Sequence, residues 1–70
     1  MGVREDVELL IQKKPGLTES EIAEEIFGPS ARQQRVNPSC RELFQIGRVE
    51  RRGLGGPGDP FRYYPIKGAQ

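Results

Sequence analysis

Apolar residues recur at helical spacing in three successive segments of the chain. In residues 3–14 they follow the order i, i+4, i+7 and i+8, which places one stripe on a helix: Val3, Val7, Leu10 and Ile11. Acidic residues occupy the first turn of this segment, lysines its last turn, and a Pro-Gly pair follows. Because this charge order suits the helix dipole, the pattern predicts helix one over about 3–14.

The second segment carries both a start signal and a stop signal. Thr18 and Glu21 have the spacing of a reciprocal capping box, and Leu17 precedes them as half of a hydrophobic staple. An apolar stripe follows, and a Gly-Pro pair ends it. We expect a short helix two over about 19–27, with an acidic outer face.

The third segment, over about 31–47, repeats the helical spacing, but its first turn is ambiguous. Its apolar stripe consists of Val36, Cys40, Leu43 and Phe44. Pro38 cannot donate a hydrogen bond to the residue four positions back, so either the helix kinks there or its regular part begins at Asn37. Gly47 supplies a stop, and the sequence therefore predicts helix three with a start between Ala31 and Asn37.

Two short stretches near the C-terminal end, about 48–52 and 61–65, alternate as strands do. Between them, "GLGGPGDP" has four glycines and two prolines in eight residues, which predicts a mobile hairpin loop. Three glycines here spell GxGxxG, but an aromatic strand follows where a dinucleotide site needs a helix, so this match is accidental. The tail, 67–70, is expected to fray.

Composition restricts the classes of function. No apolar run approaches the roughly 20 residues of a membrane span, so we expect a cytoplasmic protein with no membrane partner. With one cysteine and no histidine, the chain lacks an internal disulfide and the usual zinc ligands. The same shortage removes the common catalytic bases, and we expect no enzyme activity, no metal and no cofactor.

Charge is distributed unevenly along the chain. Residues 1–28 hold 3 basic and 7 acidic side chains, a net charge of −4, whereas residues 29–70 hold 8 basic and 3 acidic side chains, a net charge of +5. Such asymmetry in a small domain indicates one electropositive face and a polyanionic partner.

The order of these segments resembles the winged helix-turn-helix family of bacterial DNA-binding regulators. The resemblance is carried by "LTESEIAEEIFG", by "RVNPSCRELFQIGRVERR" and by "GLGGPGDPFRYY". It implies a small α+β fold in a single domain, 1–70, with three helices followed by a two-stranded β-hairpin wing. It also implies that helix three reads the major groove while the wing contacts the DNA backbone or the adjacent minor groove.

The outward face of helix three has side chains that suit base edges. Arginine can donate two hydrogen bonds to guanine, and glutamine can pair with adenine. Residues near the helix start suit bases or phosphates, and wing arginines suit the backbone. The candidate DNA-binding residues are Arg32, Gln34, Arg35, Asn37, Arg41, Gln45, Arg48, Arg52 and Arg62. Arg51 shares strand parity with Val49, so its stem is expected to pack on the core.

We therefore expect a module that binds double-stranded DNA, acting in transcription regulation or as an accessory in DNA processing. The alternative is a winged-helix module for protein–protein interaction without direct DNA binding. An exposed Ile46 beside an exposed Phe44 would favour that alternative. The sequence leaves open the target DNA sequence, any effector ligand, and a homodimer or larger protein complex.

Overall fold

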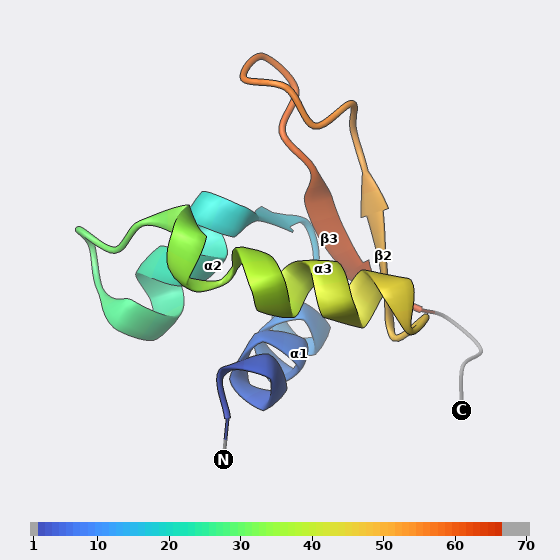
Figure 1. Cartoon of the computed structure of the whole chain (residues 1–70), viewed down its shortest axis with the longest axis horizontal. Coiled ribbons are helices and arrows are strands. Elements are labelled where there is room, and N and C mark those ends of the chain that lie inside the picture. The colour runs from blue at the N-terminus through green and yellow to red at the C-terminus, as the bar shows by residue number, and fades with distance from the viewer. Residues whose placement is uncertain (1, 67–70) are drawn as a thin grey trace.

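The computed structural model describes residues 2–66, and the expected fraying of 67–70 lies outside them. Three α-helices, one 3₁₀ turn and three strands follow one another along the chain (Figure 1): α1 Val3–Lys13, β1 Leu17–Thr18, α2 Glu19–Phe27, η1 Gln33–Arg35, α3 Asn37–Gln45, β2 Val49–Arg52 and β3 Arg62–Pro65. The fold is a small α+β arrangement with an antiparallel sheet. Within the described residues, no helix has the length and apolar character needed to cross a membrane.

The first two helices begin and end close to their predicted positions. The capping box of α2 is present: Thr18 Oγ1 accepts a hydrogen bond from the Glu21 backbone nitrogen at 3.2 Å, and Glu21 Oε1 accepts one from the Thr18 nitrogen at 2.9 Å. These two bonds satisfy amide donors that the first turn of a helix leaves unpaired. They explain why α2 starts at Glu19, as the sequence indicates.

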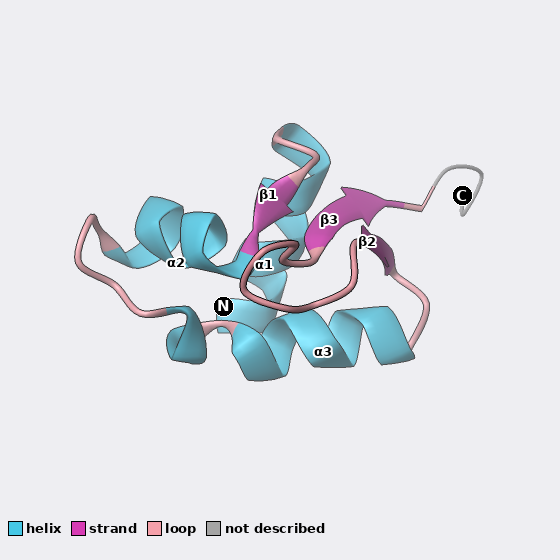
Figure 2. Ribbon diagram, turned by 90° about the horizontal axis from the view of Figure 1, so that it is seen from above, coloured by secondary structure: helices cyan, strands magenta, loops and turns pink. Residues whose placement is uncertain are grey.

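The sheet has three strands, so the predicted two-stranded wing is wrong in strand count. The strand order is β1-β3-β2, and all neighbours are antiparallel (Figure 2). Leu17 pairs with Tyr63, and Thr18 pairs with Arg62. The two residues before α2 therefore close the second edge of β3, although the sequence marks them only as a helix start. The β2–β3 pair and the loop that joins it are called the hairpin below.

Helix α3 is shorter than the predicted segment 31–47. A separate 3₁₀ turn, η1, occupies Gln33–Arg35, and the α-helix then starts at Asn37 with Pro38 in its first turn. Pro38 lacks an amide hydrogen and is tolerated only where no intrahelical bond is needed, which fixes the start there. At the other end, Gly47 has a φ of +81° and turns the chain toward β2.

The core lies between α1, α2, α3 and the inner face of the sheet. Its buried side chains are Val7, Ile11, Ile22, Ala23, Val36, Cys40, Leu43, Val49 and Tyr63. Phe44, which the stripe predicts in the core, is 39% exposed because it lies near the end of α3 and faces the hairpin. Tyr64 is half-buried, on the sheet face opposite Tyr63.

The hairpin loop has a defined shape of its own. The Asp59 carboxylate accepts a hydrogen bond from the Leu54 backbone nitrogen at 3.2 Å. The Gly55 nitrogen donates to the Asp59 carbonyl at 2.9 Å, and the Asp59 nitrogen donates to the Gly56 carbonyl at 3.1 Å. Gly55 has a φ of +86°, and a Cβ atom there would lie 2.6 Å from the Phe61 ring. The loop is therefore held by its own hydrogen bonds and packs against Phe61, at the loop end of β3.

Candidate nucleic-acid interface

The arginines separate into those with a carboxylate partner and those without one. Within residues 2–66, five cations form ion pairs of 4.0 Å or less: Arg4–Glu42, Lys14–Glu25, Arg48–Glu8, Arg52–Glu50 and Arg62–Glu21. Four arginines of this part of the chain have no such pair: Arg32, Arg35, Arg41 and Arg51. All four belong to the continuous stretch that contains η1, α3 and β2.

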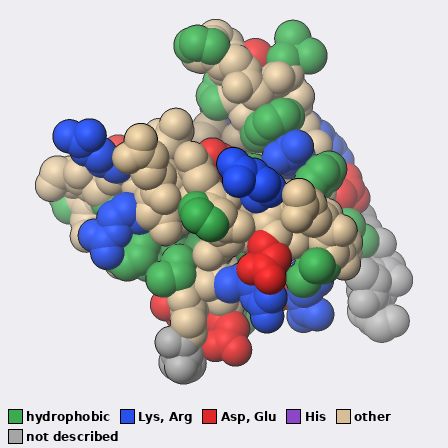
Figure 3. Space-filling model, viewed as in Figure 1, with side chains coloured by type: hydrophobic (Ala, Val, Ile, Leu, Met, Phe, Trp, Pro, Cys, Tyr) green, Lys and Arg blue, Asp and Glu red, His purple; other side chains and the backbone are tan. Residues whose placement is uncertain are grey.

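The outward side of α3 lies on the face of the molecule shown in Figure 3. Arg41 and Gln45 are exposed one helical turn apart on α3, and Gln34 is exposed on η1. Lys and Arg side chains lie on this face at its left edge, near the centre where α3 meets the hairpin, and in the lower part of the view, where acidic side chains lie beside them. The predicted residues of η1 and α3 thus combine cationic groups with amides that can pair with base edges.

Two of the arginines without a carboxylate partner are held by aromatic rings. The central carbon of the Arg35 guanidinium lies 4.0 Å from the centroid of the Phe27 ring, at the end of α2. The corresponding carbon of Arg51 lies 4.1 Å from the centroid of Phe44 and 4.1 Å from that of Phe61. Cation–π contacts orient a guanidinium group while leaving the N–H donors at its edge available.

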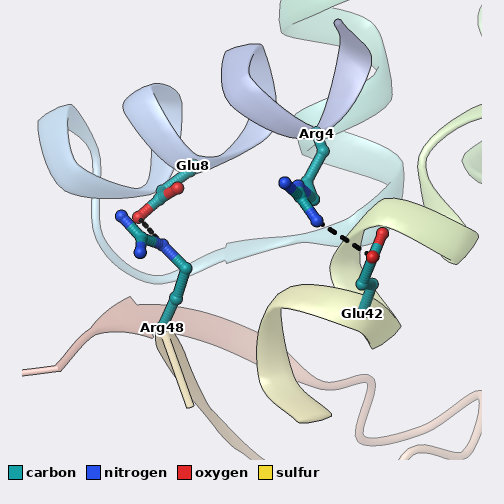
Figure 4. A network of polar contacts seen from close by, with 4 residues as sticks. All are labelled: Arg4, Glu8, Glu42 and Arg48. Atoms are coloured by element: carbon teal, nitrogen blue, oxygen red, sulfur yellow. Dashed lines mark hydrogen bonds and ion pairs between the residues drawn. The ribbon is translucent and has the colours of Figure 1, made fainter. Parts of the chain in front are cut away.

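Arg48, a predicted DNA-binding residue, points to another part of the molecule. Its Nε donates to Glu8 Oε2 of α1 at 2.7 Å, as Figure 4 shows. In the same view, Arg4 of α1 donates to Glu42 of α3 at 2.9 Å. Arg48 also precedes β2, which begins at Val49, so the predicted strand 48–52 starts one residue too early. The structure therefore does not bring Arg48 to the face that carries Arg41.

Arg52 and Arg62 lie together, but on the opposite face of the sheet. They are cross-strand partners in the register of β2 and β3, one position from the buried Tyr63. Because side chains alternate along a strand, both point away from the core and from α3. Arg62 donates to the Gly16 carbonyl at 2.9 Å, and the Arg52 guanidinium lies 4.5 Å from the centroid of Tyr64.

Asn37, another candidate contact, serves an internal hydrogen-bond network. With its amide nitrogen turned toward the interior, it donates to the Gln33 carbonyl at 2.9 Å and to Glu19 Oε1 at 2.5 Å. Tyr63 donates its hydroxyl hydrogen to Glu19 Oε2 at 2.5 Å. Burial, followed by this hydrogen bond, raises the pKa of Tyr63 well above its ordinary range. The network joins α2, α3 and β3, and it occupies the Asn37 side chain.

Cys40 lies in the core directly behind the outward face of α3. Burial, reinforced by the nearby Glu19 charge, raises the pKa of its thiol from 9.0 to about 12. The thiol therefore stays protonated at neutral pH, whereas a nucleophile or a metal ligand would need the thiolate.

Apolar side chains are also exposed near this face. Phe44 is 39% exposed and Ile46 is 54% exposed at the C-terminal end of α3, and Leu54 is 87% exposed in the hairpin loop. A groove of about 450 Å³ separates the hairpin loop from the start of α2 and from η1. Its walls include Ser20 and Gln33, which hydrogen-bond to each other at 3.2 Å. The hairpin loop, residues 53–60, thus presents the exposed Leu54 and carries no basic side chain.

The nine predicted residues thus fall into three groups. Arg32, Gln34, Arg35, Arg41 and Gln45 are exposed on η1, on α3 or just before them. Asn37 is half-buried and hydrogen-bonds within the protein, and Arg48, Arg52 and Arg62 point elsewhere. Arg51 was not among the predicted DNA-binding residues, but it lies on the same side of the molecule as the first group. Its strand parity with Val49 places it on the sheet face toward α3, and this signal could have identified it as a further candidate. Comparisons with protein-family models, with curated proteins and with solved structures found no match for this chain.

Proposed function

We propose that this chain is a winged helix-turn-helix module that binds double-stranded DNA. In this proposal α3 enters the major groove, and the hairpin is the wing that follows the backbone or the adjacent minor groove. The order of helices and strands and the sheet order β1-β3-β2 are compatible with such a fold. The process served is transcription regulation or DNA processing.

The observation that carries the proposal is the distribution of ion pairs: five cations away from η1 and α3 have carboxylate partners, whereas the arginines on or next to η1 and α3 have none within the described residues. The acids of α1 and α2 pair with Lys14, Arg48 and Arg62, whereas Arg32, Arg35 and Arg41 have no carboxylate partner within the described residues. A polyanion binding along η1 and α3 would meet cations that no internal acid neutralises. Phosphate contacts of this kind supply most of the sequence-independent affinity for DNA.

The roles within the site follow from the positions of the side chains. Arg41 and Gln45 lie on the outward side of α3 and suit guanine and adenine edges in the major groove. Arg32 and Arg35 flank the start of that helix and suit phosphates. Arg48 lies on the side of α1 and is a natural control, because its removal takes away one positive charge without touching the proposed interface.

A duplex titration over a range of salt concentrations tests the proposal. We expect a random-sequence duplex to bind at about 50 mM salt and to lose affinity steeply toward about 200 mM. Arg35→Ala should weaken all duplexes and reduce the salt slope by about one unit, whereas Arg41→Ala should also reduce discrimination between sequences. Arg48→Ala, with the same change in net charge, should alter affinity much less. Absence of binding to every duplex at low salt, or equal losses in the Arg35 and Arg48 variants, would contradict the proposal.

A protein-interaction module is the second candidate, and the exposure of Phe44 and Ile46 favours it. Large apolar side chains grouped on a surface are common at protein–protein interfaces. Ile46→Ser distinguishes the two proposals in sedimentation and DNA-binding experiments. A variant that still binds DNA but no longer self-associates would assign this end of α3 to protein contacts. Unchanged self-association would remove the second candidate as a dimer interface.

A further inference from the structure

The guanidinium group of Arg51 lies against two aromatic rings where α3 meets the hairpin. Its central carbon is 4.1 Å from the centroid of Phe44, on α3, and 4.1 Å from the centroid of Phe61, just before β3. One ring comes from the helix and the other from the point where the hairpin loop meets β3, so the contact links these two parts. A planar cation held by two rings loses little further conformational freedom when it binds a ligand.

The side chain of Arg51 is half-buried, yet no carboxylate lies within 4.0 Å of it in the described part of the chain. A partly desolvated cation is stabilised by an anion more strongly than a fully hydrated one is. The aromatic rings satisfy the faces of the group. One edge donor faces the hydroxyl of Tyr63, its cross-strand partner, and the remaining N–H donors match two oxygen atoms held in one plane. The missing partner therefore has the chemistry of a phosphate or of another paired acceptor.

Arg41 adds a second cation to this junction. It precedes Phe44 by three residues, so the two side chains are neighbours on the surface of α3. Arg41 is exposed and has no ion pair within residues 2–66. By contrast, the two other arginines of the hairpin strands, Arg52 and Arg62, point to the opposite face of the sheet. Arg51 is the strand arginine that shares a side with α3.

We propose that Arg51 is a preorganised phosphate-binding residue, which donates in-plane hydrogen bonds to one backbone phosphodiester of duplex DNA at the junction of α3 and the hairpin. This inference rests on the proposed function. A backbone phosphate suits the position better than a base edge does, because Arg51 belongs to a strand beside α3 and not to the helix proposed to enter the groove. The contact would fix the hairpin relative to α3 when DNA binds.

The experiment compares two substitutions at the same position, Arg51→Lys and Arg51→Gln, on random-sequence duplexes at several salt concentrations. Arg51→Gln removes the charge, so we expect about tenfold weaker binding to all sequences and a salt slope lower by about one unit. Arg51→Lys keeps the charge but lacks the planar fork, so affinity should fall by about threefold or more while the salt slope stays close to that of the wild type. Thermal melting of each variant checks that it is folded.

Phe61→Leu gives an independent measurement at a residue that carries no charge. It removes one of the two rings, and we expect weaker binding with an unchanged salt slope, because the phosphate contact remains but is less well positioned. If Arg51→Gln does not fold, Arg51→Lys and Phe61→Leu decide the question. Wild-type affinity and salt slope in both of these variants would overturn the inference.

The possible failures are distinguishable from one another. If the wild-type protein binds no duplex, the proposed function fails and the Arg51 inference fails with it. If the wild type binds and Arg51→Gln binds equally well, the Arg51 inference alone is overturned. A loss confined to duplexes with guanine at one position would show that Arg51 reads a base, which also overturns the phosphate assignment.

Discussion

The substitution Tyr63→Phe tests the network that joins α2, α3 and β3. The Tyr63 hydroxyl donates to Glu19 at 2.5 Å, and its side chain is fully buried. The substitution removes the hydroxyl, which hydrogen-bonds to Glu19 and also faces Arg51, and it keeps the ring, so the surrounding core contacts stay. Hydrogen bonds to charged groups contribute about 1.5–3 kcal/mol, and we expect a loss of that size in the free energy of unfolding.

This magnitude is large for so short a chain. In a domain of this size each 1 kcal/mol shifts Tm by roughly 4–8 °C, so a fall of about 6–24 °C is expected. With an m-value of about 1 kcal/mol per M for a small protein, the urea midpoint should fall by about 1.5–3 M. Far-UV circular dichroism during urea titration measures this shift. Tyr64→Phe is the matched control, because Tyr64 is half-buried and its hydroxyl is not part of the network.

A double-mutant cycle with Glu19→Ala, which removes the acceptor oxygens, separates the pair from the rest of the network. We expect the two substitutions to be non-additive by about 1 kcal/mol or more, since each removes the same hydrogen bond. A stability loss in Tyr63→Phe of less than about 0.5 kcal/mol, or full additivity in the cycle, would refute this account of the network.

Two further predictions concern the hairpin loop and alkaline pH. Gly55→Ala should destabilise the protein by about 1–3 kcal/mol in urea titrations, because φ is +86° and the new Cβ would meet the Phe61 ring at 2.6 Å. Gly58→Ala, which has open space around it, is the control, and equal effects would contradict the prediction. Cys40 and Tyr63 both have raised pKa values, so the folded state keeps protons that the unfolded state releases, and stability should be complete below about pH 9 and fall toward pH 12. For Cys40 alone, a pKa of about 12 gives a loss of about 2–3 kcal/mol at pH 11. Cys40→Ala should show a shallower fall, and constant stability over this range would contradict the assignment.

Signals that lie close together in the sequence predicted the corresponding parts of the fold. The bounds of α2 follow from Thr18, Glu21 and the Gly-Pro pair after the helix, and all of these lie within about three turns of one another. The strand β1 could not be found in this way. Two residues have no periodicity, and Leu17 is defined as a strand only by its pairing with Tyr63, far along the chain.

The candidate site shows the same limit. Strand alternation correctly assigned the stem of Arg51 to the core side, because that rule needs only the neighbouring residues. The direction of Arg48 depends on Glu8, which is 40 residues away, and no local pattern contains that pairing. Phe44 fits the apolar stripe of α3, yet it is partly exposed because the helix ends one residue later and the core does not extend to that turn.

Because Cys40 is buried, its reactivity toward a thiol reagent can measure local opening of the structure. It is the single cysteine of the sequence, and its side chain has no solvent-exposed area. A thiol reagent can therefore modify a molecule only after α3 has separated from the core, and the modification rate measures how often this happens in the absence of denaturant. A ligand that binds only the closed form should slow the modification of Cys40 as the fraction of ligand-bound protein rises. The modification rate at several ligand concentrations would therefore give the affinity of the ligand.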